Sequence, residues 1–91
     1  MHIRGARLHF YIPQAMSLKD KRQVSRSLVD KSRRRFNLSI AEVDTQDVHQ
    51  SLTIGVAVVS GEVSHAEDSL DEIIRFLENH AEAELVEVEM I

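Results

Sequence analysis

The sequence contains no cysteine, only one proline, and only three glycines. Without cysteine, the chain has no disulfides, thiolate zinc sites or thiol nucleophiles. The glycines, at positions 5, 55 and 61, form no cluster, so there is no glycine-rich phosphate loop. No apolar run is long enough to span a membrane, and Met1–Gly5 lacks the apolar core of a signal peptide. We therefore expect a cytoplasmic protein with no membrane association.

Charge is distributed unevenly along the 91 residues, although the net charge is only −4. Residues 1–35 carry ten Lys/Arg and two Asp, a net of +8. Residues 36–91 carry one Arg and thirteen Asp/Glu, a net of −12. Such asymmetry between the two parts of a chain indicates a charged partner, unless the charges merely solvate exposed faces.

Hydrophobic periodicity predicts six elements in the order β-α-β-β-α-β. Alternating apolar residues predict strands near 3–12, 38–43, 52–60 and 86–90, and a break in the alternation indicates a bulge in the second. Ser17 and Ser64 each begin a capping-box pattern that opens a helix. This order predicts one α+β domain over residues 1–91 with a ferredoxin-like fold, a four-stranded antiparallel sheet with two helices on one face.

Residues that share a face of these elements predict the core and the surface. The predicted core residues are Phe10, Leu28, Phe36, Ile54, Val56, Leu70, Ile73, Leu77 and Val88. The outward face of the second helix is acidic, with Glu67, Asp68, Asp71, Glu72 and Glu78. The outward face of the first helix is basic, and its candidate nucleic-acid-binding residues are Lys19, Lys21, Arg22, Arg26, Arg33 and Arg34. Three of these cations fall in the first turn, where they oppose the helix dipole and would suit a bound phosphate.

Catalytic and metal chemistry find little support in the sequence. Asp44, Asp47 and His49 are the best metal candidate, but a polar turn held by aspartate side chains explains them better, so we expect no metal site. The serines that begin the two helices are explained as caps, and no cofactor motif is present. We therefore expect a protein that is not an enzyme and needs no cofactor.

The sheet face away from the helices should be open. It would display Arg7, His9 and Tyr11 beside Thr53, Gly55 and Ala57. With a single strong stacking residue, this face does not suit base stacking of the kind used by RNA-recognition motifs. Its small side chains suit close approach by another surface, and a second copy of the chain is the expected occupant.

Three segments together resemble one known family. They are Ile12–Arg22 (IPQAMSLKDKR), Ala41–Asp47 (AEVDTQD) and Leu52–Ser60 (LTIGVAVVS), and the similarity extends over essentially the whole chain. They resemble the YlxP-like family, a bacterial domain family of unknown function. The resemblance implies a ferredoxin-like fold and supplies no catalytic or binding residues. Genes of this family tend to lie near genes for translation initiation and ribosome maturation, which implies ribosome-related work.

Two functional hypotheses follow. The first is a non-enzymatic accessory protein that docks on structured RNA, ribosomal RNA in particular, through the basic first helix. The second is a self-associating structural or regulatory module with no nucleic-acid role, formed through opposite helix charges or through the open sheet face.

Overall fold

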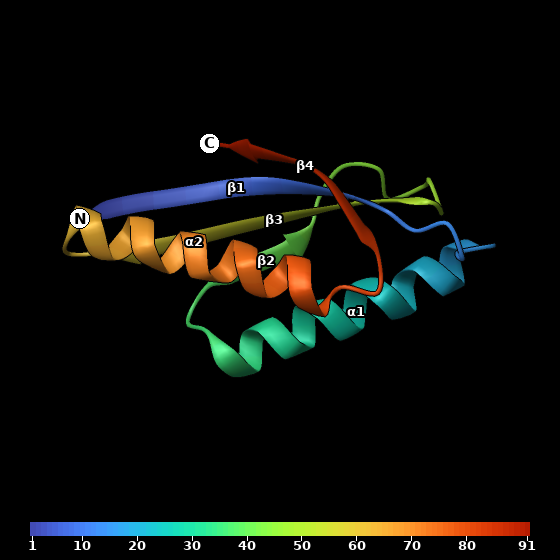
Figure 1. Ribbon diagram of the computed structural model, residues 1–91, viewed down its shortest axis with the longest axis horizontal. Coiled ribbons are helices and arrows are strands. Elements are labelled where there is room, and N and C mark those ends of the chain that lie inside the picture. The colour runs from blue at the N-terminus through green and yellow to red at the C-terminus, as the bar shows by residue number, and fades with distance from the viewer.

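A computed structural model describes all residues 1–91 and shows a ferredoxin-like α+β fold. The elements follow the predicted order: β1 (His2–Tyr11), α1 (Leu18–Arg35), β2 (Ser39–Glu42), β3 (Ser51–Ser60), α2 (Val63–His80) and β4 (Glu84–Met90). The four strands form one antiparallel sheet in the order β2-β3-β1-β4. Both helices lie on the same face of this sheet (Figure 1). Neither helix is long and apolar enough to cross a membrane.

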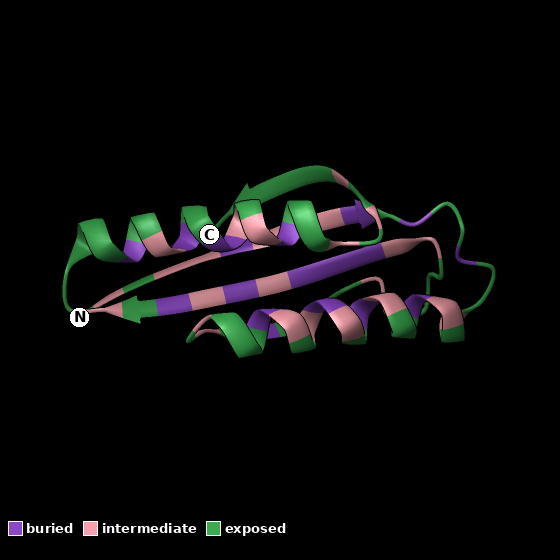
Figure 2. Ribbon diagram, turned by 60° about the horizontal axis from the view of Figure 1, so that its bottom comes forward, coloured by how far each residue is buried: buried purple, intermediate pink, exposed green.

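The core lies between the sheet and the helices, and buried residues alternate with half-buried ones along much of β1 and β3 (Figure 2). All but two of the predicted core residues are buried. Phe36 is only half-buried, and its ring packs edge-on against Phe76 with centroids 5.2 Å apart. The prediction that Val88 is buried is wrong, because this residue is 37% exposed. Val88 is exposed because it lies on β4, an edge strand of the sheet that the helices do not cover.

The two helices begin differently. Ser17 is the N-cap of α1, and its hydroxyl accepts a hydrogen bond from the Asp20 amide, as the capping pattern predicted. The predicted cap at Ser64 is wrong, because α2 already begins at Val63 and its N-cap position makes no side-chain hydrogen bond. Ser60, just before the helix, accepts instead from the Glu62 amide and contacts His65 at 3.0 Å.

The predicted bulge is also misplaced. The short β2 pairs with β3 without interruption from Ser39–Ala57 to Glu42–Ile54. The irregularity falls between β1 and β4, at His9 and Phe10. A bulge at an edge strand is common, because the outer side of that strand has no ladder to maintain.

Candidate nucleic-acid interface and open sheet face

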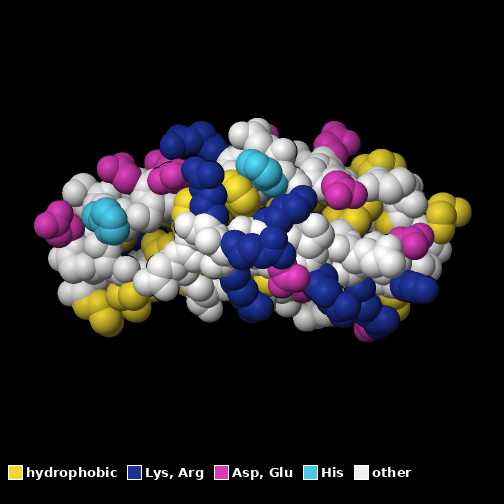
Figure 3. All heavy atoms as spheres, turned by 90° about the horizontal axis from the view of Figure 1, so that it is seen from below, with side chains coloured by type: hydrophobic (Ala, Val, Ile, Leu, Met, Phe, Trp, Pro, Cys, Tyr) yellow, Lys and Arg dark blue, Asp and Glu magenta, His cyan; other side chains and the backbone are white.

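The basic surface of α1 is built by one stripe of long cationic side chains. We define the basic stripe as Lys19, Arg22, Arg26, Arg33 and the adjacent Arg34, all of which are exposed. Four of them recur at spacings of three, four and seven residues, which place side chains on one side of a helix. Viewed from below, Lys and Arg side chains run across the middle of the molecule and along its lower right edge (Figure 3).

No member of the basic stripe has a carboxylate oxygen within 4.0 Å. Arg35, just outside the stripe, does have such a partner, Glu72 of α2, at 3.7 Å. Arg33 donates to the backbone carbonyl of Ile40 on β2 at 3.2 Å. Together with Arg22 and Arg26 it lines a groove of about 450 Å³ between α1 and the β2 edge, into which Asp30 and Glu42 also project. The groove therefore carries three guanidinium groups and two carboxylates, of which Glu42 is already paired with Lys21.

Part of the charge on α1 has a structural explanation. Arg33 and Arg34 lie in the last turn, where cations stabilise the helix dipole. Lys19 lies in the first turn, where it opposes the dipole, whereas Arg22 lies just beyond that turn. The N-terminus of α1 is capped by two hydrogen bonds. The Asp20 amide donates to the Ser17 hydroxyl, and the Asp20 carboxylate accepts from the Met16 amide. Lys19 consequently stands out as a member of the stripe that helix stability does not explain.

Lys21 is not part of the exposed surface, contrary to its place among the candidate nucleic-acid-binding residues. Its side chain is 1% exposed and its ammonium group lies 3.0 Å from a carboxylate oxygen of Glu42. The same ammonium donates to the carbonyls of Thr45, Gln46 and Ser51, at 2.5, 3.1 and 3.3 Å. A phosphate cannot reach this group, so Lys21 is a structural residue that ties α1 to the β2–β3 connection.

The ion pair of Lys21 leaves one oxygen without a hydrogen bond. An ammonium group has three protons, and three carbonyls receive them, two in the β2–β3 connection and one at the start of β3. Glu42 Oε2 is buried and accepts no hydrogen bond, although the ammonium lies beside it. Lys21 therefore holds this oxygen by charge attraction rather than by a hydrogen bond.

The β2–β3 connection is held on its other side by the sheet. Asp44 and Thr45 both have φ of 45°, the left-handed region that a β-branched residue such as Thr45 rarely adopts. The Thr45 hydroxyl lies 3.1 Å from that of Thr53, and Asp44 accepts from Arg7 at 3.2 Å. These contacts carry the chain across the end of the sheet. Thr53, predicted to be displayed on the open face, is consequently only 1% exposed.

The same contacts bear on whether Asp44, Asp47 and His49 are arranged as metal ligands. Asp44 is occupied by Arg7, and no group of three or more His, Asp or Glu side chains in the structure is arranged to hold a metal ion. Asp44, Asp47 and His49 therefore do not converge on a common point.

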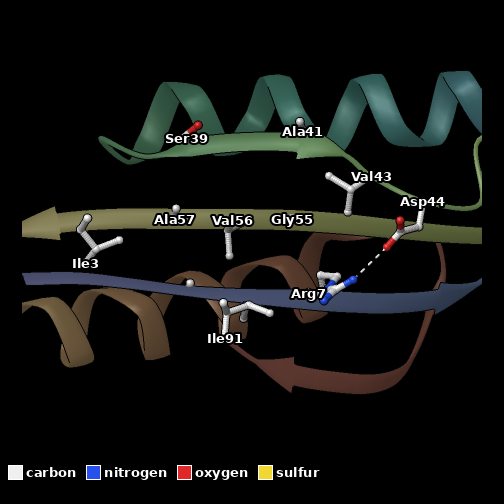
Figure 4. A pocket seen from close by; sticks show the side chains of 12 residues that line it. Ile3, Arg7, Ser39, Ala41, Val43, Asp44, Gly55, Val56, Ala57 and Ile91 are labelled. Carbon is white, nitrogen blue, oxygen red and sulfur yellow. Dashed lines mark hydrogen bonds and ion pairs between the residues drawn. The ribbon is translucent and has the colours of Figure 1, made fainter.

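The rest of the open sheet face contains an apolar hollow of about 510 Å³. Its floor is formed by small residues of β2 and β3, and Ile3, Arg7 and Ile91 stand around it (Figure 4). The neighbouring Val43 favours glycine at position 55, because a Cβ there would lie 3.2 Å from a Val43 methyl. Ile3 and Ile91 are 61% and 72% exposed, so apolar area is displayed around the hollow.

Beyond the hollow the face becomes polar. Glu89 lies 3.5 Å from both Arg7 and His9, and the other ring nitrogen of His9 lies 3.3 Å from the Thr53 hydroxyl. Tyr11, at the far end of β1, is 42% exposed. The face thus displays one exposed aromatic ring, Tyr11, beside polar and charged groups.

Sequence reasoning missed the role of Lys21, although a signal was present. Residues 21, 25, 28 and 32 share one arc of α1, and in the structure all four are buried. Ser25, Leu28 and Ser32 already identify the arc in the sequence, and a lysine on it indicates a buried ammonium with partners. Which partners it meets depends on the path of the β2–β3 connection, which no periodicity describes.

Comparison with known proteins identifies relatives over nearly the whole chain. A family model described as "Protein of unknown function (DUF503)" matches residues 3–90. The uncharacterized protein YlxP of Bacillus subtilis (strain 168) is 34% identical over 73 residues, which are 80% of this chain and 79% of that protein. These matches confirm the resemblance to the YlxP-like family.

Proposed function

The chain belongs to the DUF503 family of unknown function, and we propose that it is a non-enzymatic accessory protein that binds structured RNA through the basic stripe. Ribosomal RNA is the partner we propose first, and the cytoplasm is where the two would meet. The proposal rests on one observation, the five exposed cations of the stripe without a carboxylate partner.

The dimensions of the stripe suit a polyanion. Arg33 lies fourteen positions after Lys19, which corresponds to about 21 Å along the helix at about 1.5 Å per residue. Phosphates that bind such a row release condensed counterions, and this release supplies most of the affinity at low salt. Contacts to phosphate carry no base information, so binding would follow RNA shape rather than sequence.

The acidic surface of α2 restricts how RNA would approach. Glu67, Asp68, Asp71, Glu72 and Glu78 are all exposed on that helix. Their charge repels phosphates at close range, whereas at physiological salt it is screened beyond about 8 Å. RNA would therefore engage α1 from the side of the β2 edge, away from α2.

The test removes three arginines together, Arg22→Gln, Arg26→Gln and Arg33→Gln. Glutamine is a good helix former, so stability should change little. Affinity for ribosomal RNA should fall across sequences, and the slope of log affinity against log salt should decrease by about 0.7–0.9 for each phosphate that the variant no longer neutralises. Co-sedimentation with ribosomal particles at low salt should disappear in parallel.

A matched control removes the same charge elsewhere, with Arg4→Gln, Lys31→Gln and Arg75→Gln. These cations lie off the stripe, so the control should keep the salt slope of the unmodified protein. Equal affinity of the stripe variant and the unmodified protein, with unchanged co-sedimentation, would refute the proposal. Equal losses of affinity in the stripe variant and the control would show that RNA is attracted by the overall positive charge and not by the stripe.

A second candidate function is a self-associating module with no nucleic-acid role. The observation that favours it is the exposed apolar area around the hollow of the open sheet face, since a small domain rarely leaves such area uncovered. Mass measurement with and without RNA separates the two candidates, because only self-association raises the mass of the protein alone.

A further inference from the structure

The open sheet face consists of two unequal halves. The protruding side chains Arg7 and Ile91 lie toward β4, and the hollow beside them is floored by small residues of β2 and β3 together with Gly5 of β1 (Figure 4). The strand register places the two kinds side by side. Arg7 lies opposite Gly55, which lies opposite Ala41, and Gly5 lies opposite Ala57, which lies opposite Ser39.

The protruding residues of β4 continue these rows. Glu89 pairs with Arg7, and the Ile91 amide donates to the Gly5 carbonyl at 3.0 Å. Across the sheet, one row is therefore Glu89, Arg7, Gly55 and Ala41, and the next is Ile91, Gly5, Ala57 and Ser39. In both rows the large side chains lie toward β4 and the small residues lie toward β2.

We infer that a second copy of this chain covers the open face. The two copies are related by a two-fold axis that lies between their sheets, runs parallel to the strands, and passes over the midline between β1 and β3. This inference rests on the self-association candidate and is independent of RNA binding. Rotation about this axis reverses the strand order and keeps the position along the strands. Arg7 then lies over the partner's Gly55, and Ile91 lies over the partner's Ser39. Each copy places its protruding half against the hollow half of the other.

Charge selects this arrangement over the other aligned stack of two sheets. An axis in the sheet plane but perpendicular to the strands would place β4 on the partner's β4. Glu84, Glu87 and Glu89 lie opposite Tyr11, His9 and Arg7, so they share the open face with the odd-numbered residues of β1. That stack would bring six carboxylates together, and like charges at an interface are strongly unfavourable. In the inferred arrangement β4 faces β2, whose open-face residues are the neutral Ser39 and Ala41. The carboxylate that follows this strand, Asp44, is paired with Arg7 of its own copy.

The area available implies a weak, reversible dimer. Strands of ten residues extend about 33 Å and four strands span about 19 Å, so the face offers at most roughly 600 Å² per copy. Standard interfaces bury about 800 Å² per partner, and smaller ones belong to transient complexes. Self-association should therefore depend on protein concentration.

The first test is sedimentation equilibrium of the full chain without RNA. Protein concentrations up to about 1 mM would detect a dimer whose dissociation constant is as weak as about 1 mM. The unmodified protein should show a monomer–dimer equilibrium. Ala57→Arg places a charge in the hollow, and Ile91→Ser removes a protruding apolar side chain with little risk to folding. Each should raise the dimer dissociation constant at least about tenfold. Met16→Arg, at a residue that is 78% exposed and precedes α1, is the control and should leave the constant unchanged.

The second test exploits the absence of cysteine, because each engineered thiol is then unique. Copies with Ser39→Cys and copies with Ile91→Cys are mixed and treated with a short bismaleimide. The mixture should form covalent dimers much faster than either variant alone, since β4 of one copy lies over β2 of the other. Linkage of Ile91→Cys copies to each other at the rate of the mixture would overturn this arrangement while leaving self-association intact. A strict monomer throughout the concentration range would overturn both.

Discussion

Replacing Lys21 by methionine tests the ion pair that ties α1 to the β2–β3 connection. The substitution keeps the apolar stem and removes the charge. Removing one partner of a buried ion pair costs about 3–5 kcal/mol of unfolding free energy, because the other charge remains buried. The Glu42 side chain is 19% exposed, so water recovers part of this penalty. Three carbonyls also lose their donor, at about 1 kcal/mol each before they turn toward solvent. We expect a net loss of about 3 kcal/mol.

Urea denaturation provides the measurement. With a slope of about 1–3 kcal/mol per molar urea, the midpoint should fall by about 1–3 M at unchanged slope. Arg22→Gln, one residue away and exposed, is the control and should stay within about 0.5 kcal/mol. Adding Glu42→Gln to the Lys21→Met variant should restore part of the stability, because it removes the stranded charge. A loss below about 1 kcal/mol for Lys21→Met, or a further loss on adding Glu42→Gln, would refute the reasoning.

Two further predictions concern local structure. Ser17→Ala should cost about 1 kcal/mol of stability in urea or thermal melts, because Ser17 caps α1, whereas Ser64→Ala should be neutral because Ser64 caps nothing. Equal effects of the two changes would contradict the assigned caps. Gly55→Ala should cost about 1 kcal/mol, since its Cβ would crowd the Val43 methyls, and Val43→Ala in the same chain should relieve that crowding in thermal melts. Additive losses of stability in the double variant would contradict this explanation.

Periodicity was sufficient to predict the fold. Alternation in β1 and β3 and the helical spacing of α1 and α2 determine which residues must be covered, and the order of the elements then leaves few arrangements of the sheet. The errors at Ser64 and Val88 arise where periodicity carries no information. The cap of a helix depends on where the preceding strand ends, and the burial of a strand depends on its position in the sheet.

The candidate site was predicted only in part. Exposed members of the basic stripe follow from the helical wheel, but the charge of Lys21 favoured a place on the surface. Its burial depends on Glu42 and three carbonyls from a segment more than twenty residues away. Thr53 was predicted on the open face for a similar reason, since its cover comes from the left-handed turn at Asp44 and Thr45. Neither the turn at Asp44 and Thr45 nor the contacts of Lys21 with Glu42 and the carbonyls leave a repeating pattern in the sequence.

Both helices lie on one face of the sheet, and this one-sidedness determines how many RNA-binding surfaces an assembly would present. A monomer offers the basic stripe on one side and the apolar hollow on the opposite side. A pair joined through the hollow directs both copies of α1 outward, on opposite sides of the assembly. Two stretches of RNA could then be held at once, and the second would bind at the high effective concentration that the first creates. Dimerisation would thus make the proposed RNA binding bivalent, although each copy would contact RNA through the same side chains as before.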